Sequence, residues 1–195
     1  MTGRAVVWTM VVLMSQEVID RATNLVHGFD ARIQAVDAGS WGNAAPCEGW
    51  TARDVVVHVG NNLLGLGAAL TGGQGREISA DEDIVAAWDE ARDGFLGALP
   101  TADLSTVVPG PFGPMLAEQV IGRLVCTDVM VHTWDLARAT GGDEYLDAAA
   151  VEGAYSGLKP MDAMIRMPGV FGPKIDPPAG ADLQTEFLCF LGRRV

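Results

Sequence analysis

Apolar residues recur at intervals of three and four along most of the chain, the period of helices with one buried face. The first such helix is expected from about Gln16 to Ala38, with Ser15 as its N-cap. His27 falls on its polar side, so we expect this histidine in solvent. The buried side is formed by Ala22, Leu25, Val26, Phe29, Ile33 and Val36.

The second helix is predicted by a capping signal followed by a hydrophobic run. Thr51 precedes the helix and Asp54 lies three positions later, the spacing of a capping box. The body, residues 55–64, is apolar on nearly every side and is therefore expected to be buried. His58 lies in the middle of this run, and Asn62 follows one turn later on the same side.

Later segments extend the helical pattern. Ser79 and Glu82 resemble a second capping box and introduce a helix from about Asp81 to Leu99. Prolines and glycines in residues 101–114 predict an irregular connection. Further helices are expected from Pro114 or Met115 to Thr140, from Asp147 to Met167 with a break near Pro160, and from Leu183 to Leu191, with an extended loop over residues 168–180.

Four long helices with connections of mixed length predict an all-α fold, a four-helix bundle with extra short C-terminal helices. The length of 195 residues suits a single domain, which we assign to residues 15–195. Residues 1–14 stand apart as an apolar leader that lacks a small-x-small cleavage site and is too short to span a bilayer. We interpret them as disordered, as an added turn or strand, or as a start codon assigned too early.

Charge and cysteine content narrow the class of protein. The formal charge of −12 and scattered arginines argue against nucleic acid as a partner, because phosphate binding requires clustered cations. No membrane partner is expected either. Three widely spaced cysteines, Cys47, Cys126 and Cys189, form neither a disulfide framework nor a Cys-x-x-Cys motif. We therefore expect a cytoplasmic protein, monomeric or homodimeric.

A row of polar residues continues an apolar stripe of the fourth helix. Asp128 and His132 are four residues apart, and Asp135 follows roughly one turn later. Since the stripe is formed by Ala117, Ile121 and Leu124, we expect the polar row to point inward. A buried carboxylate without a partner costs several kcal/mol. Its partner is an arginine, a histidine or a metal ion.

Two interpretations of this row compete. His58, Asp128 and His132 could bind a divalent metal from two neighbouring helices and leave coordination positions open for water or substrate. Alternatively, Asp128 and His132 form a local hydrogen bond, and His58 is a core histidine. Because the Asp-x-x-x-His spacing is common by chance, spacing alone slightly favours the second interpretation.

Other polar residues have weaker assignments. Asp135 could orient a metal ligand or pair with Arg138, and Asn62 could contact a substrate or cap a backbone group. Cys47 precedes a helix N-terminus, which can lower a thiol pKa, although a small buried hydrophobic role is favoured for it. The sequence contains no Gly-rich phosphate loop, nucleophile elbow or dinucleotide fingerprint.

Two segments resemble a known family. Residues 46–59, PCEGWTARDVVVHV, and residues 127–141, TDVMVHTWDLARATG, resemble the second and fourth helices of DinB-like proteins, in the branch of the mycothiol-dependent maleylpyruvate isomerase N-terminal domain. The ending, with residues 168–173 and 187–193, is similar to a subgroup of that branch. The resemblance implies a DinB-like bundle with a divalent metal held by His58, Asp128 and His132.

Departures from the family limit what the resemblance implies. The isomerase uses glutamate where Asp128 stands, and many relatives use histidine. Asp128 is one methylene shorter than glutamate, which bears on metal identity and affinity. Zinc is favoured over nickel, manganese or iron. Only a short tail follows the predicted bundle, so maleylpyruvate isomerisation itself is not carried over.

The resulting hypothesis is a metalloenzyme that uses a low-molecular-weight thiol, mycothiol, as cosubstrate in transfer or isomerisation of a small electrophile. Asp135 and Asn62 would assist from beside the metal or at the substrate. A metal-dependent hydrolase and a non-catalytic metal- or ligand-binding bundle are the alternatives.

Overall fold

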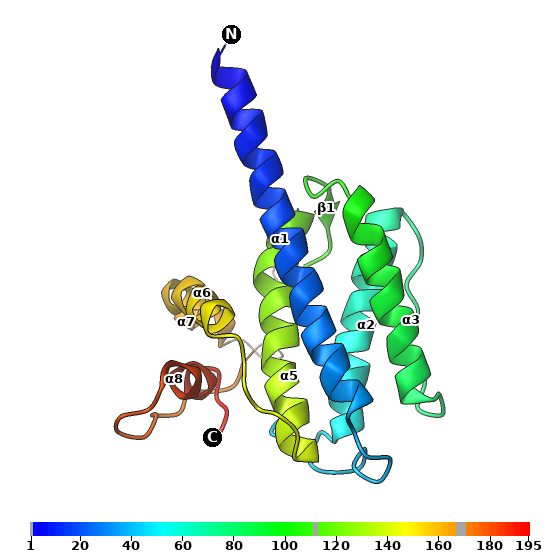
Figure 1. Cartoon of the computed structure of the whole chain (residues 1–195), viewed down its shortest axis with the longest axis vertical. Coiled ribbons are helices and arrows are strands. Elements are labelled where there is room, and N and C mark those ends of the chain that lie inside the picture. The colour runs from blue at the N-terminus through cyan, green and yellow to red at the C-terminus, as the bar shows by residue number, and fades with distance from the viewer. Residues whose placement is uncertain (1, 111–112, 167–170) are drawn as a thin grey trace.

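Four long helices pack side by side in a computed structural model that describes residues 2–110, 113–166 and 171–195, with residues 2–14 described as backbone only. They are α1 (Thr2–Gln34), α2 (Ala52–Thr71), α3 (Ile84–Ala98) and α5 (Cys126–Thr140) (Figure 1). Helix α2 packs between α3 and α5, and α1 packs against α5. The predicted all-α bundle is confirmed.

Helix α1 starts earlier and ends earlier than predicted. Its N-terminal part projects beyond the other helices (Figure 1), and Ser15 lies within it instead of capping it. No glycine or proline occurs between Arg4 and His27, so nothing in the sequence interrupts the helix there. Ala22, Val26, Phe29 and Ile33 are buried as expected, whereas Leu25 and Val36 are partly buried, and His27 is exposed.

The capping box of α2 is confirmed and that of α3 is wrong. The Thr51 hydroxyl accepts from the Asp54 amide at 3.3 Å, and the Asp54 carboxylate accepts from the Thr51 amide at 2.8 Å. Asp83, not Ser79, caps α3, through a bond from the Ala86 amide at 2.9 Å. Glu82 does accept from the Ser79 amide, but it also binds Arg76 and holds the loop before the helix.

The fourth helix is not uniform. It begins as α4 (Ala117–Gln119), continues as the π-helix η2 (Val120–Val125) and only then becomes α5. The wider π turns rotate the preceding residues relative to α5, and Leu124 of the predicted stripe is only partly buried. Before it, β1 (Val107–Val108) and β2 (Met115–Leu116) form a short antiparallel pair in the segment predicted to be irregular.

The C-terminal helices cover one side of α5 (Figure 1). They are α6 (Ala148–Leu158), the 3-10 turn η3 (Lys159–Met161), α7 (Asp162–Ile165) and α8 (Leu183–Phe190); another 3-10 turn, η1 (Leu99–Thr101), ends α3. Buried Met130, Val131 and Trp134 of α5 form an apolar cluster with α6 and α8. The break near Pro160 is confirmed. Residues 171–180 contain no helix or strand, and the rest of the predicted loop lies outside the described residues.

Within the described part of the chain, no helix is both long enough and apolar enough to cross a membrane.

Candidate metal site

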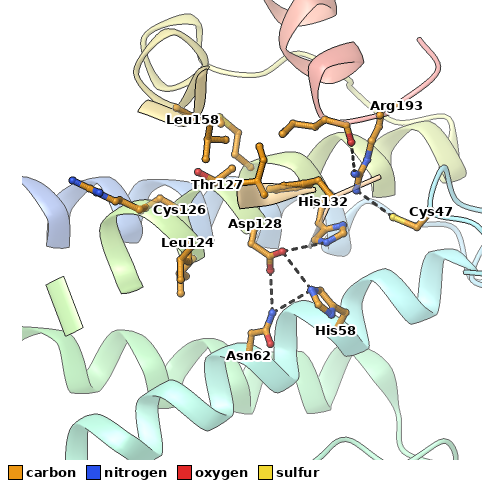
Figure 2. A pocket seen from close by; sticks show the side chains of 18 of the residues that line it. Cys47, His58, Asn62, Leu124, Cys126, Thr127, Asp128, His132, Leu158 and Arg193 are labelled. Atoms are coloured by element: carbon orange, nitrogen blue, oxygen red, sulfur yellow. Dashed lines mark hydrogen bonds and ion pairs between the residues drawn. The ribbon is translucent and has the colours of Figure 1, made fainter. Parts of the chain in front are cut away.

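Helices α2 and α5 bring the predicted ligands together (Figure 2). His58 Nε2 lies 3.3 Å from Asp128 Oδ1, and His132 Nε2 lies 3.4 Å from the same oxygen. The Asn62 amide donates to Asp128 Oδ2 at 3.1 Å, with its nitrogen 3.2 Å from His58 Nε2. Both imidazoles therefore contact the same carboxylate oxygen of Asp128, and Asn62 donates a hydrogen bond to the other oxygen.

These spacings fit a divalent metal. The three candidate ligand atoms of His58, Asp128 and His132 lie within 4.8 Å of one another. Bonds of about 2.0–2.2 Å to a tetrahedral zinc ion place neighbouring ligand atoms about 3.3–3.5 Å apart. The two observed contacts to Asp128 are of this length. Two nitrogens and one oxygen also suit zinc.

The site is open on one side. The side chains of His58 and Asp128 are 35% and 27% exposed, whereas that of His132 is 7% exposed. The expectation that His58 occupies a core position is therefore only partly met, because its side chain contacts Asp128 of α5 but is also exposed to a cleft. An open side is what substrate access to a catalytic metal requires.

Charge is concentrated between the two helices. Burial alone raises the pKa of Asp128, but the His132 and His58 imidazoles more than reverse this and hold that pKa well below its usual range. Burial likewise lowers the pKa of His132, but the Asp128 and Asp135 carboxylates raise it well above the ordinary histidine value. The arrangement thus attracts positive charge to the point where His132 Nε2 meets Asp128.

Asp135 contacts the Nδ1 side of the His132 ring, opposite the Nε2 side that faces Asp128. Its carboxylate is fully buried, and Oδ2 lies 2.9 Å from His132 Nδ1. The alternative prediction, that Asp135 pairs with Arg138, is wrong. Arg138 pairs with Glu144 at 2.7 Å, while Arg193 donates to both Asp135 oxygens at 3.1 and 2.8 Å. With Nδ1 bound to Asp135, Nε2 of His132 faces Asp128 Oδ1 on the other side of the ring.

Cys47 and Trp50 form the remaining wall. The Cys47 thiol is half-buried, not fully buried, and its sulfur lies 3.4 Å from Asp135 Oδ2 and 3.3 Å from Arg193 Nη2. The Trp50 ring stacks on His132 with centroids 5.7 Å apart. Arg193 was missed, since nothing in the local sequence connects it with α5.

The site opens into a large cleft with a cavity volume of about 2290 Å³. Apolar residues of α5 and α6, including Met130 and Leu158, line part of it. Two carboxylate residues line it, Glu48 and Asp128. More cationic residues line it, namely Arg21, Arg123, Arg138, Arg166, Lys174, Arg193 and Arg194. Arg138, Arg166, Lys174 and Arg193 are paired with carboxylates that lie outside this lining, whereas Arg123 and Arg194 are exposed along it.

Comparison with known proteins identifies the family of this chain. The model of the family described as the mycothiol maleylpyruvate isomerase N-terminal domain matches residues 22–137, which include His58, Asp128 and His132. Two uncharacterized proteins of Mycobacterium tuberculosis, from two strains, are each 32% identical over 173 residues, covering 86% of this chain and 92% of theirs. No solved structure matches the chain. The chain therefore belongs to the mycothiol maleylpyruvate isomerase N-terminal domain family, which confirms the predicted resemblance over residues 22–137.

Proposed function

We propose that this chain binds one divalent metal through His58, Asp128 and His132 and uses mycothiol in the transfer or isomerisation of a small electrophile. The observation that supports it best is the convergence of two imidazole nitrogens and one carboxylate oxygen at the mouth of a cleft. Membership of a family named for a mycothiol-dependent isomerase supports the choice of thiol. Zinc is favoured over nickel, manganese or iron because the ligands are two nitrogens and one oxygen.

A divalent metal held there would supply Lewis-acid chemistry, lowering the pKa of a bound thiol. The side chains around the site would position the three metal ligands. Asp135 holds the His132 ring by its Nδ1, and Asn62 holds the second oxygen of Asp128, so that Oδ1 stays between the imidazoles. Trp50 shields the His132 ring on one face. The exposed Asn62 also lies where a substrate would enter.

The residues that line the cleft suit an anionic thiol or an anionic electrophile. Arg123 and Arg194 are exposed along its lining, so their guanidinium groups are accessible to a carboxylate or a sugar hydroxyl. The apolar wall from Met130 to Leu158 suits the carbon skeleton of a small electrophile. Orientation of both partners next to the metal is the main catalytic contribution that we propose for the protein.

A turnover experiment separates this function from its alternatives. Zinc-loaded protein is incubated with maleyl, epoxide and aryl-halide electrophiles, with and without mycothiol. We expect product only when zinc and mycothiol are both present, and none from His58→Ala. Turnover with zinc and water alone would identify a hydrolase. Zinc binding without turnover of any electrophile would favour a non-catalytic binding bundle. His27→Ala, which changes an exposed histidine on α1, is the matched control.

A further inference from the structure

His132 belongs to two groups of potential metal ligands. On its Nε2 side are Asp128 and His58, and on its Nδ1 side are Asp135 and Cys47. The ligand atoms of Cys47, His132 and Asp135 also lie within 4.8 Å of one another. Thiolate, imidazole and carboxylate are all ligands of zinc and cobalt. The second group could therefore compete for the metal.

In the structure, a guanidinium group supplies the cation of this second group. Arg193 donates to Asp135 Oδ1 at 3.1 Å and to Oδ2 at 2.8 Å. Its Nη2 lies 3.3 Å from Cys47 Sγ (Figure 2). The Arg193 side chain is 11% exposed and the Asp135 side chain is not exposed at all. A planar guanidinium binds both oxygens of a carboxylate at once, which a bound water or a lysine does not reproduce.

The conformation of the C-terminal backbone places the Arg193 side chain next to Asp135. The Arg193 amide donates to the Leu188 carbonyl at 2.9 Å, which fastens the tail to α8. Gly192 before it has φ +85°, and a Cβ there would lie 2.8 Å from the Pro173 carbonyl oxygen. Two reasons therefore exclude a side chain at position 192: the positive φ angle favours glycine, and the Pro173 carbonyl leaves no room for a Cβ. The tail holds Arg193 in a defined place.

We propose that Arg193 is a positioning residue that serves as the built-in cation of the Cys47–His132–Asp135 group, keeping metal off Cys47 and directing metal to His132 Nε2. The inference rests on the proposed metal site. Without Arg193, the buried Asp135 carboxylate loses its positive partner, and a buried carboxylate requires one. A divalent ion that displaces the Cys47 thiol proton to solvent would replace the lost charge.

Cobalt(II) tests this inference, because cysteine thiolate bound to cobalt gives a sulfur-to-cobalt charge-transfer absorption in the near ultraviolet. We expect cobalt-loaded wild type to lack this band, Arg193→Ala to show it, and Arg193→Ala combined with Cys47→Ser to lack it again. Arg194→Ala, which removes the exposed neighbouring arginine, should resemble wild type. An Arg193→Ala spectrum identical to wild type would overturn the proposal.

The remaining comparisons keep the proposal testable if Arg193→Ala does not fold. Arg193→Gln keeps the length and one donor to Asp135 without the charge, and should give the same band as Arg193→Ala. A band already present in wild type and lost in Cys47→Ser would overturn the proposal without any change at Arg193. Wild type that binds no cobalt would instead contradict the proposed function, and a thiolate band in Arg193→Ala would then still support the role of Arg193.

An affinity measurement separates positioning from simple exclusion. In a Cys47→Ser background, where no thiolate competes, Arg193→Ala should weaken cobalt binding by about 10- to 100-fold, the usual effect of losing a group that orients a metal ligand. Unchanged affinity in this background would show that Arg193 does not act on His132.

Discussion

Asp135→Asn removes the negative charge from a fully buried position and leaves the size of the side chain almost unchanged. In the wild type this carboxylate binds Arg193 through two contacts and His132 through one. The variant therefore leaves the guanidinium of Arg193, with a side chain only 11% exposed, without its counter-charge. Removal of one partner of a buried ion pair costs about 3–5 kcal/mol. For a chain of this size each kcal/mol shifts the melting temperature by about 2–4 °C.

We therefore expect metal-free Asp135→Asn to melt about 6–20 °C below wild type, combining these two ranges. Thermal unfolding followed by circular dichroism measures the shift. The double variant Asp135→Asn with Arg193→Met should recover much of it, because no unpaired charge remains. Asp143→Asn provides the matched control. It breaks the Arg32–Asp143 ion pair of 2.8 Å, in which Asp143 is 67% exposed, and should leave the melting temperature nearly unchanged.

Two results would refute this reasoning. If Asp135→Asn and Asp143→Asn had equally small effects, the buried pair would carry no special stability. If the double variant lost as much stability as the sum of its single changes, Asp135 and Arg193 would not be coupled as their contacts indicate.

Further predictions concern capping, acid stability and metal linkage. Thr51→Ala removes the capping box of α2 and should lower the free energy of unfolding in urea by about 1 kcal/mol; no change would mean that the cap is not used. Burial raises the pKa of Asp30, but hydrogen bonds from Trp88 and Arg92 lower it overall. The ionised Asp30 carboxylate therefore stabilises the fold above the unfolded-state pKa of about 4, and this stabilisation is lost as pH falls. Asp30→Asn should therefore flatten the loss of stability in acid, and an unchanged pH profile would contradict this. Zinc at 100 times its dissociation constant should raise the unfolding free energy of wild type by about 2.7 kcal/mol but should not stabilise His58→Ala, and equal stabilisation of both would count against the site.

The parts of the site that could be predicted from the sequence are those with local spacing. Asp128 and His132 share a helix at a spacing of four, and His58 lies in an apolar run that had to pack against other helices. The α5 register and the capping box at Thr51 follow from the same short-range rules. These features need only a few consecutive residues to be recognised.

The parts that could not be predicted depend on distant contacts. Arg193 meets Asp135 across 58 positions of sequence, and Arg138 was a nearer candidate on the same helix. The π-helix before α5 has no periodic signal of its own, and it shifted the predicted stripe at Leu124. The start of α3 was misplaced because Ser79 and Asp83 are both good capping residues, and tertiary contacts of Glu82 decided between them.

The most direct test of the account is the metal content of the purified protein, measured by plasma mass spectrometry after incubation with zinc. The account predicts close to one zinc per chain in wild type and in His27→Ala, and strong loss of zinc in both His58→Ala and Asp128→Ala. Absence of metal from wild type after incubation with zinc, nickel, manganese and iron(II) would contradict it, and Asp128 would then be a partly buried structural partner of two histidines.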